Sequence, residues 1–252
     1  MSKHEKGYRA TQYSEKPIQT FNDKRWFWHN GKPKNVELVN DNKSLIVVPT
    51  AKLDYWSKTF YGPEPLIISN GQTLLTKIEY DIECTITTKF TLEPCEQFDQ
   101  AGIMILVDEN VWVKAGVEYT DGKPNLSCVV TNEGFSDWST QGIEMDDDSN
   151  VEKDGRQKVT IGIRVSKLRP GIIQGPSLIM EACFFKTESE ALKEEKELKW
   201  SQVRIASLRS SESQPWFMGI FSNSPTKQNG SKVKFHSIKL GEKIEPVHDA
   251  SL

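Results

Sequence analysis

The sequence has no hydrophobic run long enough to cross a membrane. Its longest apolar stretch covers residues 101–107, whereas a spanning helix needs about 20 consecutive apolar residues. The first residues, MSKHEK, are mostly polar or charged and lack the apolar core of a secretory signal. We therefore expect a cytoplasmic protein without a membrane partner, in which residues 101–107 form a buried strand.

Cysteine is scarce and scattered. The chain has four cysteines, which form no CxxC pair and have no histidine at metal-site spacing: Cys84, Cys95, Cys128 and Cys183. Zinc sites need ligands grouped at short, characteristic spacings. We therefore expect free thiols, no metal site and no cofactor.

Neither sign of charge dominates. Lys and Arg number 32 against 35 Asp and Glu, for a net charge of −3. No stripe of basic residues interleaved with aromatic ones is present, although proteins that bind nucleic-acid phosphates carry such a positive face. The charge balance argues against a nucleic-acid partner and favours a neutral ligand such as a sugar.

Common catalytic motifs are also missing. The chain contains no GxSxG elbow, no glycine-rich phosphate loop and no HExxH, which supply a nucleophile, bind phosphate or hold a catalytic zinc ion. His29 and His236 have no evident Ser or Cys partner in the sequence. We expect structural or surface roles for both histidines.

The sequence does contain the two-residue periodicity of β-strands. Apolar and polar residues alternate through residues 77–89, 111–119 and 159–165, as in strands with one buried face. Further strands are predicted at residues 25–29, 44–48, 101–107, 125–130, 178–185, 203–208, 216–221 and 232–240. Asx-Gly and Pro-Gly turns separate many of them. This pattern predicts an all-β jelly-roll sandwich of two antiparallel sheets.

We expect one domain over residues 21–245, with an N-terminal tail at 1–20 and a C-terminal tail at 246–252.

Two segments depart from the strand pattern. In residues 187–199, Thr187 as N-cap and an acidic first turn favour a short exposed helix. The acidic insertion at 141–157 favours a surface loop, because the EF-hand spacing of a calcium site is absent. We expect both insertions to decorate the surface, with contact to a partner protein as the alternative.

The predicted strand at residues 111–119 carries an unusual polar face. Alternation places four residues opposite the apolar ones, namely Trp112, Lys114, Gly116 and Glu118. An aromatic ring can stack on a sugar, charged groups can hydrogen-bond hydroxyls or amides, and a glycine permits close approach. This face therefore predicts a ligand-binding groove.

Neighbouring strands extend the predicted groove. Gln100 falls on the same face of the preceding strand and Ser127 on that of the following strand, with Trp138 at the rim. Asp99 and Asp137 are expected to support these residues by hydrogen bonding.

The same residues allow a second interpretation. Trp112 and Trp138 would then fill a small second core beneath a loop. Lys114 and Glu118 would merely pair across the surface.

Glu79, Asp81 and Glu83 form the one catalytic alternative. Carboxylates on alternate residues of a strand resemble the E-x-D-x-E strand of laminarinase-like and lichenase-like glycoside hydrolases, which are also jelly rolls. Tyr80 replaces a small aliphatic residue of that pattern, and the aromatic surroundings are missing. A retaining glycoside hydrolase would hold the carboxyl oxygens of Glu79 and Glu83 about 5–5.5 Å apart in the groove.

Several segments together resemble the DUF1349 family. They are residues 98–104 (FDQAGIM), 112–119 (WVKAGVEY), 126–131 (LSCVVT) and 137–139 (DWS). Residues 53–59 (LDYWSKT) resemble the family's upstream D-[FY]-W segment, and residues 221–225 (FSNSP) its late S-P turn. The resemblance extends over roughly residues 26–240.

The resemblance implies a concanavalin A-like lectin or glucanase jelly roll and places the residues from Gln100 to Ser139 on the ligand-facing sheet. It brings no established activity. Because fungal members of the family are linked to enolase regulation, it implies a non-catalytic regulatory role in sugar metabolism. The implied ligand is a carbohydrate or sugar phosphate, and the implied protein partner is a glycolytic enzyme such as enolase.

Overall fold

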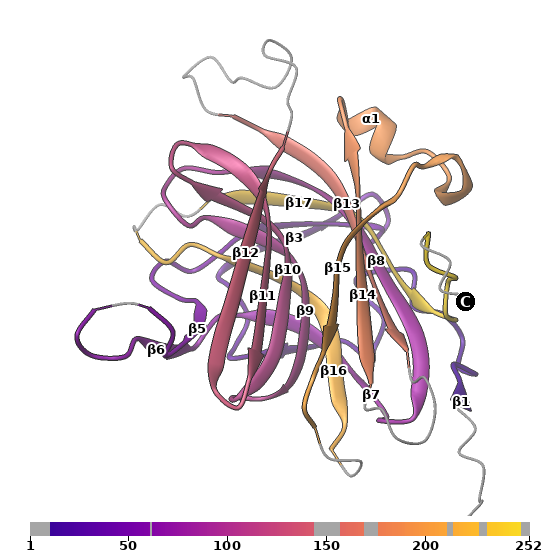
Figure 1. Cartoon of the computed structure of the whole chain (residues 1–252). Coiled ribbons are helices and arrows are strands. Elements are labelled where there is room, and N and C mark those ends of the chain that lie inside the picture. The colour runs from indigo at the N-terminus through magenta and orange to yellow at the C-terminus, as the bar shows by residue number, and fades with distance from the viewer. Residues whose placement is uncertain are drawn as a thin grey trace, which may run out of the picture.

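The structure is a computed structural model that describes residues 11–60, 62–143, 157–168, 176–210, 214–226 and 231–247. Two large β-sheets lie face to face and enclose the main hydrophobic core between them (Figure 1). Helix is confined to α1 (Glu188–Ala191) and the 3₁₀ turn η1 (Glu195–Glu197) within these residues. The predicted all-β jelly-roll class is confirmed.

One sheet has eight strands. They are β1 (Thr11–Gln12), β3 (Asn35–Val39), β4 (Ser44–Val48), β8 (Ile82–Glu93), β13 (Val159–Leu168), β14 (Ser177–Phe185), β15 (Ser201–Ser207) and β17 (Lys232–Gly241). Their order is β15-β14-β13-β8-β17-β4-β3, and β1 pairs in parallel with β8. All other pairs in this sheet are antiparallel.

The second sheet has seven strands and carries the candidate site. They are β2 (Phe27–His29), β7 (Thr73–Ile78), β9 (Gln100–Asp108), β10 (Val111–Thr120), β11 (Lys123–Asn132), β12 (Phe135–Gly142) and β16 (Trp216–Asn223). Their order is β12-β11-β10-β9-β16-β7-β2. A small hairpin of β5 (Tyr55–Ser57) and β6 (Ile67–Ser69) lies at the left of the sandwich in Figure 1.

The predicted alternation of β10 explains how this sheet contributes to the core. Val113, Ala115 and Val117 are at most 3% exposed and belong to the main core cluster. Because side chains alternate across a strand, the residues between them lie on the outer face. β10 pairs with β9 on one side and β11 on the other, which confirms the predicted adjacency of the three strands.

The predicted single strand at residues 77–89 is wrong in one respect. The chain leaves the seven-stranded sheet at Ile78 and enters the eight-stranded sheet at Ile82. Lys167 Nζ holds the intervening turn by donating to the carbonyl oxygens of Glu79 (3.1 Å), Tyr80 (2.6 Å) and Ile82 (2.6 Å). Both strands point apolar residues into the same core, so the alternation continues across the turn.

The segment at residues 187–199 contains the predicted short helix but covers a sheet. Thr187 caps α1, and its Oγ1 accepts a hydrogen bond from the Glu190 backbone N–H at 3.4 Å. Ala191 and Trp200 form a buried cluster with side chains of β14. Burying this apolar cluster removes it from water, so the segment protects the eight-stranded sheet and does more than decorate it. Most of the other insertion, residues 144–156, lies outside the described residues.

Part of the expected N-terminal tail packs against the sandwich. Tyr13 and Ile18 are 6% and 1% exposed and belong to the core cluster. The Ile18 backbone N–H and C=O each hydrogen-bond Leu240 at 2.9 Å. Residues 11–20 therefore contribute to the packing of the eight-stranded sheet.

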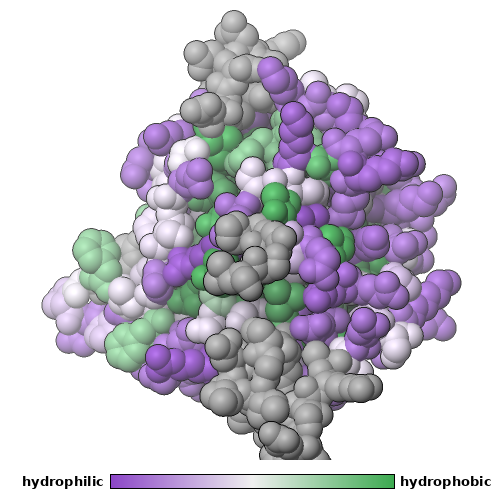
Figure 2. Space-filling view, turned by 45° about the vertical axis from the view of Figure 1, so that its right-hand side comes forward, coloured by the Kyte–Doolittle hydropathy of each residue, from purple (hydrophilic) through white to green (hydrophobic). Residues whose placement is uncertain are grey.

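The surface in Figure 2 is mainly hydrophilic, with separate hydrophobic patches between the polar residues. No helix in the described part of the chain is long and apolar enough to cross a membrane.

Candidate functional site

The outer face of the seven-stranded sheet carries polar side chains that are almost inaccessible to solvent. Gln100, Lys114 and Glu118 are 2%, 4% and 7% exposed. Gln100 lies opposite Glu118 across β9 and β10, and Ser127 on β11 lies opposite Gly116. The sequence analysis correctly placed these residues on one face but did not predict their burial.

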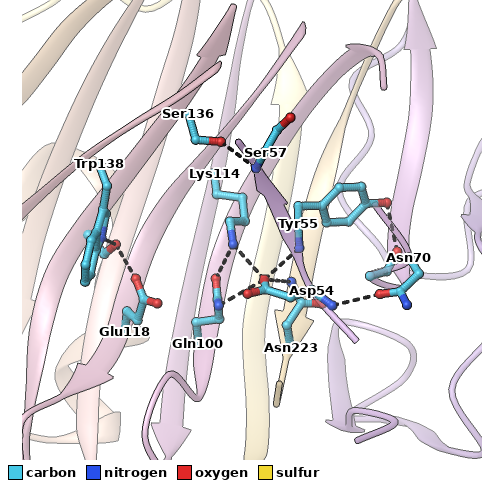
Figure 3. A network of polar contacts seen from close by, with 12 residues as sticks. Asp54, Tyr55, Ser57, Asn70, Gln100, Lys114, Glu118, Ser136, Trp138 and Asn223 are labelled. Carbon is cyan, nitrogen blue, oxygen red and sulfur yellow. Dashed lines mark hydrogen bonds and ion pairs between the residues drawn. The ribbon is translucent and has the colours of Figure 1, made fainter. Parts of the chain in front are cut away.

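Asp54, immediately before β5, is the centre of the polar network (Figure 3). Its Oδ1 accepts hydrogen bonds from the Tyr55 backbone N–H (2.7 Å), Lys114 Nζ (2.7 Å), Gln100 Nε2 (3.1 Å) and Asn223 Nδ2 (3.3 Å). Lys114 Nζ also donates to Gln100 Oε1 at 2.8 Å. One carboxylate oxygen therefore connects β5 to β9, β10 and β16.

Backbone and side-chain bonds fix β5 at both ends. The Asp54 backbone N–H donates to Asn70 Oδ1 at 3.0 Å, and its carbonyl oxygen accepts from the Asn70 N–H at 3.1 Å. At the other end, Ser57 Oγ donates to the Gly134 carbonyl at 2.7 Å, and the Ser57 N–H donates to Ser136 Oγ at 3.0 Å. The position of Asp54 is thus set by the hairpin and by β12.

Lys114 holds a positive charge in a nearly dry environment. Its side chain is 4% exposed, and that of its ion-pair partner Asp54 is 14% exposed. The ammonium also lies 5.8 Å from the ring of Trp112 and 5.9 Å from that of Phe221, within the range of a cation–π interaction. A charge removed from water in this way requires its partner, because an uncompensated buried ion is strongly destabilising.

Glu118 is the second carboxyl group of the site and has a different environment. Ser127 Oγ donates to its Oε2 at 2.7 Å, and Trp138 Nε1 donates to Ser127 Oγ at 2.9 Å. Burial, with a smaller contribution from the charge of Asp54, raises the pKa of Glu118 to about 7 against the opposing effect of Lys114. Near neutral pH this carboxyl can therefore donate or accept a proton.

These groups line a pocket of about 280 Å³ between β5–β6 and the sheet, which we call the Asp54 pocket. Its walls are mostly apolar, and its polar groups come from three residues. The lining residues are Asp54, Trp56, Leu66, Ile68, Phe98, Lys114, Glu118, Val129, Trp138 and Pro225.

The arrangement suits a small ligand with both apolar and hydroxyl-bearing faces. Trp56 and Trp138 meet edge to face, with ring centroids 6.3 Å apart, and offer aromatic surface. Asp54 and Glu118 supply carboxyl oxygens to the lining. A few convergent polar groups in an apolar cavity are the usual composition of a small-molecule site.

Trp112 does not line this pocket, contrary to the predicted groove. It is fully buried, and its ring centroid lies 5.7 Å from that of Tyr55 in β5. It belongs to a second hydrophobic cluster beneath the hairpin, and the partly buried Trp138 packs against this cluster. The second-core interpretation therefore holds for Trp112, whereas Trp138 remains at the pocket wall.

Gly116 also serves a different purpose from the predicted ligand approach. A Cβ added to Gly116 would lie 2.0 Å from the carbonyl oxygen of Ala101 and 2.7 Å from the Cα of Gly102. The missing side chain therefore allows β9 and β10 to approach each other.

Asp99 and Asp137 lie outside the pocket lining. Asp99 Oδ2 accepts hydrogen bonds from the backbone N–H groups of Cys95 (2.7 Å) and Glu96 (2.8 Å), and burial raises its pKa above the ordinary value. It orders the loop that carries Phe98. Asp137 is exposed and pairs with Arg204 of β15 at 3.1 Å, so it connects the edges of the two sheets.

The structure does not bring Glu79, Asp81 and Glu83 into the Asp54 pocket. Glu79 is 62% exposed and pairs with Lys77 at 2.7 Å, while Asp81 Oδ2 accepts from Thr11 Oγ1 at 2.8 Å. Glu83 lies on β8 of the other sheet. Because the chain turns between the sheets at residues 79–81, these carboxylates do not share one strand face as predicted.

Sequence reasoning missed the residues that arrive from distant segments. Asp54, Trp56 and Asn223 lie in segments that resemble the family, but the local pattern predicts no role for them. Phe98 adopts a left-handed backbone conformation with φ of 69°, which is uncommon for a bulky residue and is found at functional sites. The recurring D-[FY]-W segment was the feature that could have identified Asp54 and Trp56.

Comparison with known proteins agrees with the resemblance. A family model described as a protein of unknown function, DUF1349, matches residues 28–169, which is more than half of the chain. The chain belongs to the DUF1349 family. The matched residues include Asp54, Lys114, Glu118 and Trp138.

Curated relatives of this DUF1349 protein match over a limited length. "Regulation of enolase protein 1" of Saccharomyces cerevisiae is 36% identical over 113 residues, or 45% of this chain and 52% of that protein. An uncharacterised protein of Emericella nidulans, AN7484, is 31% identical over 90 residues, or 34% of this chain and 42% of that protein. The matches thus span about half the length of these relatives or less.

Solved structures extend the similarity over most of the DUF1349 chain. A functionally unknown protein from Saccharomyces cerevisiae superposes with a TM-score of 0.66 at 26% identity, covering 88% of this chain and 98% of that one. The Bacteroides ovatus protein "Xyloglucan PUL GH43B" gives a TM-score of 0.59 at 11% identity, covering 90% of this chain but 40% of that one. The second likeness shows the fold alone.

Proposed function

We propose that this protein is a non-catalytic binding protein whose Asp54 pocket holds a neutral carbohydrate. The observation that supports this most is the buried Asp54–Lys114–Gln100 network, which ends in an aromatic-walled pocket beside Glu118. Fixed hydrogen-bonding groups next to aromatic rings suit a sugar, which has hydroxyls on its edge and C–H groups on its faces.

The size and charge of the pocket narrow the ligand class. Its volume of about 280 Å³ is at the low end for small-molecule sites, which favours one or two sugar rings. Lys114 is already neutralised by Asp54 at 2.7 Å. The pocket therefore has no unpaired cation for a phosphate among its described residues, and a neutral sugar is favoured over a sugar phosphate.

We further propose a regulatory role in sugar or central carbon metabolism, exerted in the cytosol. The support is the similarity to a yeast protein named for the regulation of enolase, with a glycolytic enzyme such as enolase as the proposed partner. All four cysteines are free thiols, as is usual in the reducing cytosol.

A binding experiment that compares the wild type with variants inside and outside the pocket tests the ligand proposal. The protein is screened on an array of neutral glycans, and positive sugars are titrated by calorimetry. Asp54→Asn keeps the shape of the side chain but removes the charge that orients Lys114. Because hydrogen bonds to charged groups contribute about 1.5–3 kcal/mol, we expect sugar affinity to fall by about 10-fold or more.

Two further variants keep this test interpretable. Trp138→Ala removes aromatic surface from the half-buried rim and should also weaken sugar binding. Asp108→Asn makes the same chemical change outside the pocket and should leave affinity unaltered. An array without any positive glycan, or equal affinity in Asp54→Asn and the wild type, would contradict the proposal.

Deleting the insertion at residues 187–199 would be a poor test of the partner proposal. Removing residues 187–199 would expose the cluster of Cys183, Phe185 and Trp200 and destabilise the sheet. The tip of β5–β6 is a better target, because Phe60 and Ile67 are 88% and 62% exposed. Phe60→Ser with Ile67→Ser should abolish capture of purified enolase, and retained capture would reject this surface.

A further inference from the structure

A second and larger pocket lies on the opposite side of β5. Its volume is about 410 Å³, and we call it the Phe217 pocket. Tyr55 turns to this side, whereas its neighbours Asp54 and Trp56 line the other pocket. The lining residues are Phe27, His29, Asn30, Tyr55, Ser69, Leu75, Leu106, Val107, Asp108, Glu109 and Phe217.

The floor of the Phe217 pocket is aromatic and aliphatic. Phe27 and Phe217 meet edge to face, with ring centroids 5.7 Å apart and an angle of 85° between the rings. Phe27 is 41% exposed, so part of its ring surface is open to a ligand. Leu75 and Leu106 complete the apolar floor from β7 and β9.

The charge at this pocket is negative. Asp108 and Glu109 line one side, and neither forms an ion pair among the described residues. Asp108 accepts only neutral donors, the Asn110 N–H at 2.8 Å and Gln214 Nε2 at 3.1 Å. Burial lowers the pKa of His29, so its ring is neutral at pH 7 and the pocket has no cation of its own.

The basic residue that pairs with Phe217 in the sheet register already forms an ion pair. Lys77 pairs with Phe217 across β7 and β16, but its ammonium forms an ion pair with Glu79 at 2.7 Å. Two carboxylates therefore remain uncompensated beside exposed aromatic surface. Such surface attracts cations through the negative face of each ring.

We propose that the Phe217 pocket binds an organic cation, a primary ammonium or guanidinium group carried on an apolar stem. The stem lies on Phe27 and Phe217, and the cation faces Asp108 and Glu109. This ligand complements the pocket in both polarity and charge. The site is independent of the carbohydrate site proposed above.

The test compares a cation with its neutral isostere. Full-length protein labelled at Leu, Ile and Val methyl groups is titrated with 2-phenylethylamine and, separately, with 2-phenylethanol, at pH 7. The methyl groups of Leu75 and Leu106 report on the Phe217 pocket, and those of Ile68 and Val129 report on the Asp54 pocket. We expect shifts only at the first pair and at least about 10-fold tighter binding of the amine, from its attraction to two carboxylates.

Variants then separate the contribution of the carboxylates to amine binding from that of the aromatic rings. Asp108→Asn should weaken amine binding by about 3- to 10-fold without changing that of the alcohol. Phe217→Leu should weaken amine binding by about 2- to 5-fold through loss of the cation–π contribution. Glu37→Gln neutralises an exposed carboxylate on β3 of the other sheet and serves as the matched control.

A second ligand distinguishes the source of the cation. The peptide acetyl-Gly-Arg-Gly-amide presents a guanidinium as a partner protein would. Binding of the peptide in preference to the amine assigns the pocket to a protein partner, and the reverse assigns it to a free amine. Equal affinity for amine and alcohol, or shifts at Ile68 and Val129 instead of Leu75 and Leu106, would overturn the proposal.

Discussion

The two pockets share one wall, the three-residue strand β5, yet they have opposite chemical character. On one side Asp54 accepts four hydrogen bonds and neutralises Lys114. On the other side Tyr55 faces a floor of phenylalanine and leucine beside unpaired carboxylates. Alternation along a strand is enough to separate a hydrogen-bonding site from an aromatic and acidic one. One short hairpin therefore separates two pockets of different chemical character.

The largest expected effect removes the support that both pockets share. Trp112 is fully buried beneath Tyr55, so Trp112→Ala should destabilise the protein by about 3–5 kcal/mol through the cavity it leaves. Because β5 rests on this ring, binding of sugar and of amine should both weaken. Urea unfolding and the two titrations measure these effects. Trp112→Phe, which keeps much of the volume, should lose far less, and an equal loss would contradict a packing role.

A change at Asp54 should affect one pocket only. Asp54→Ala leaves the ammonium of Lys114 without its counter-charge, and breaking a buried ion pair costs about 3–5 kcal/mol. Lys114→Met in the same chain should restore part of this stability by removing the stranded charge. Chemical denaturation of the two variants checks this. Equal stability of the single and double variants would show that Lys114 is not held by Asp54.

Glu118 should make the stability of the protein sensitive to pH. Its pKa rises from 4.5 in the unfolded chain to about 7 in the fold, so the folded state binds the additional proton between these values. The stability contributed by Glu118 is therefore greatest below pH 4.5 and is lost as pH rises to about 7. One pKa unit corresponds to about 1.4 kcal/mol, which gives a total on the order of 3 kcal/mol.

Glu118→Gln tests this pH dependence. The amide can still accept the hydrogen bond from Ser127, but it cannot ionise beside Asp54. The variant should gain stability relative to the wild type as pH rises from 5 to 8, with no gain near pH 4.5. Denaturation curves across this range measure the difference. A difference that is constant with pH would show that Glu118 titrates normally.

The smallest effect is expected at the turn between the sheets. Glu79→Gln removes an exposed ion pair with Lys77, and such pairs contribute at most about 1 kcal/mol. Neither pocket includes this residue. Thermal unfolding and the sugar titration should therefore match the wild type. A measurable loss of sugar binding would indicate that the Glu79 carboxylate contributes to the binding site.

Local periodicity predicted one half of the Asp54 pocket and could not predict the other. The alternation of residues 111–119 correctly placed Lys114 and Glu118 on one face of β10. That pattern contains no information about which distant segment covers the face. Asp54 reaches Lys114 across 60 positions and Asn223 across 169, and only tertiary packing determines such contacts. This explains why polar residues predicted to be open are buried.

The same limit explains the error at residues 77–89. Ile78 and Ile82 both point into the core, although they belong to different sheets. Periodicity records which side of the chain is buried, and a turn that keeps that side facing the same core leaves the pattern unchanged. Lys167 stabilises the turn by donating hydrogen bonds to three of its carbonyl groups. Because Lys167 lies on a strand far along the chain, local periodicity does not reveal this interaction.

The long separations around Asp54 also determine when the site forms during folding. The β10–β11 hairpin closes through the tight Asp121-Gly122 turn, whose residues have φ of 54° and 82°, and such local pairing forms early. The polar network is complete only when Asn223, which lies 169 positions beyond Asp54, has reached it. Closing so long a loop is slow. A chain emerging from the ribosome is therefore expected to form its hairpins before the Asp54 pocket. Ligand binding at the Asp54 pocket therefore requires that nearly the whole sandwich has been synthesised and assembled.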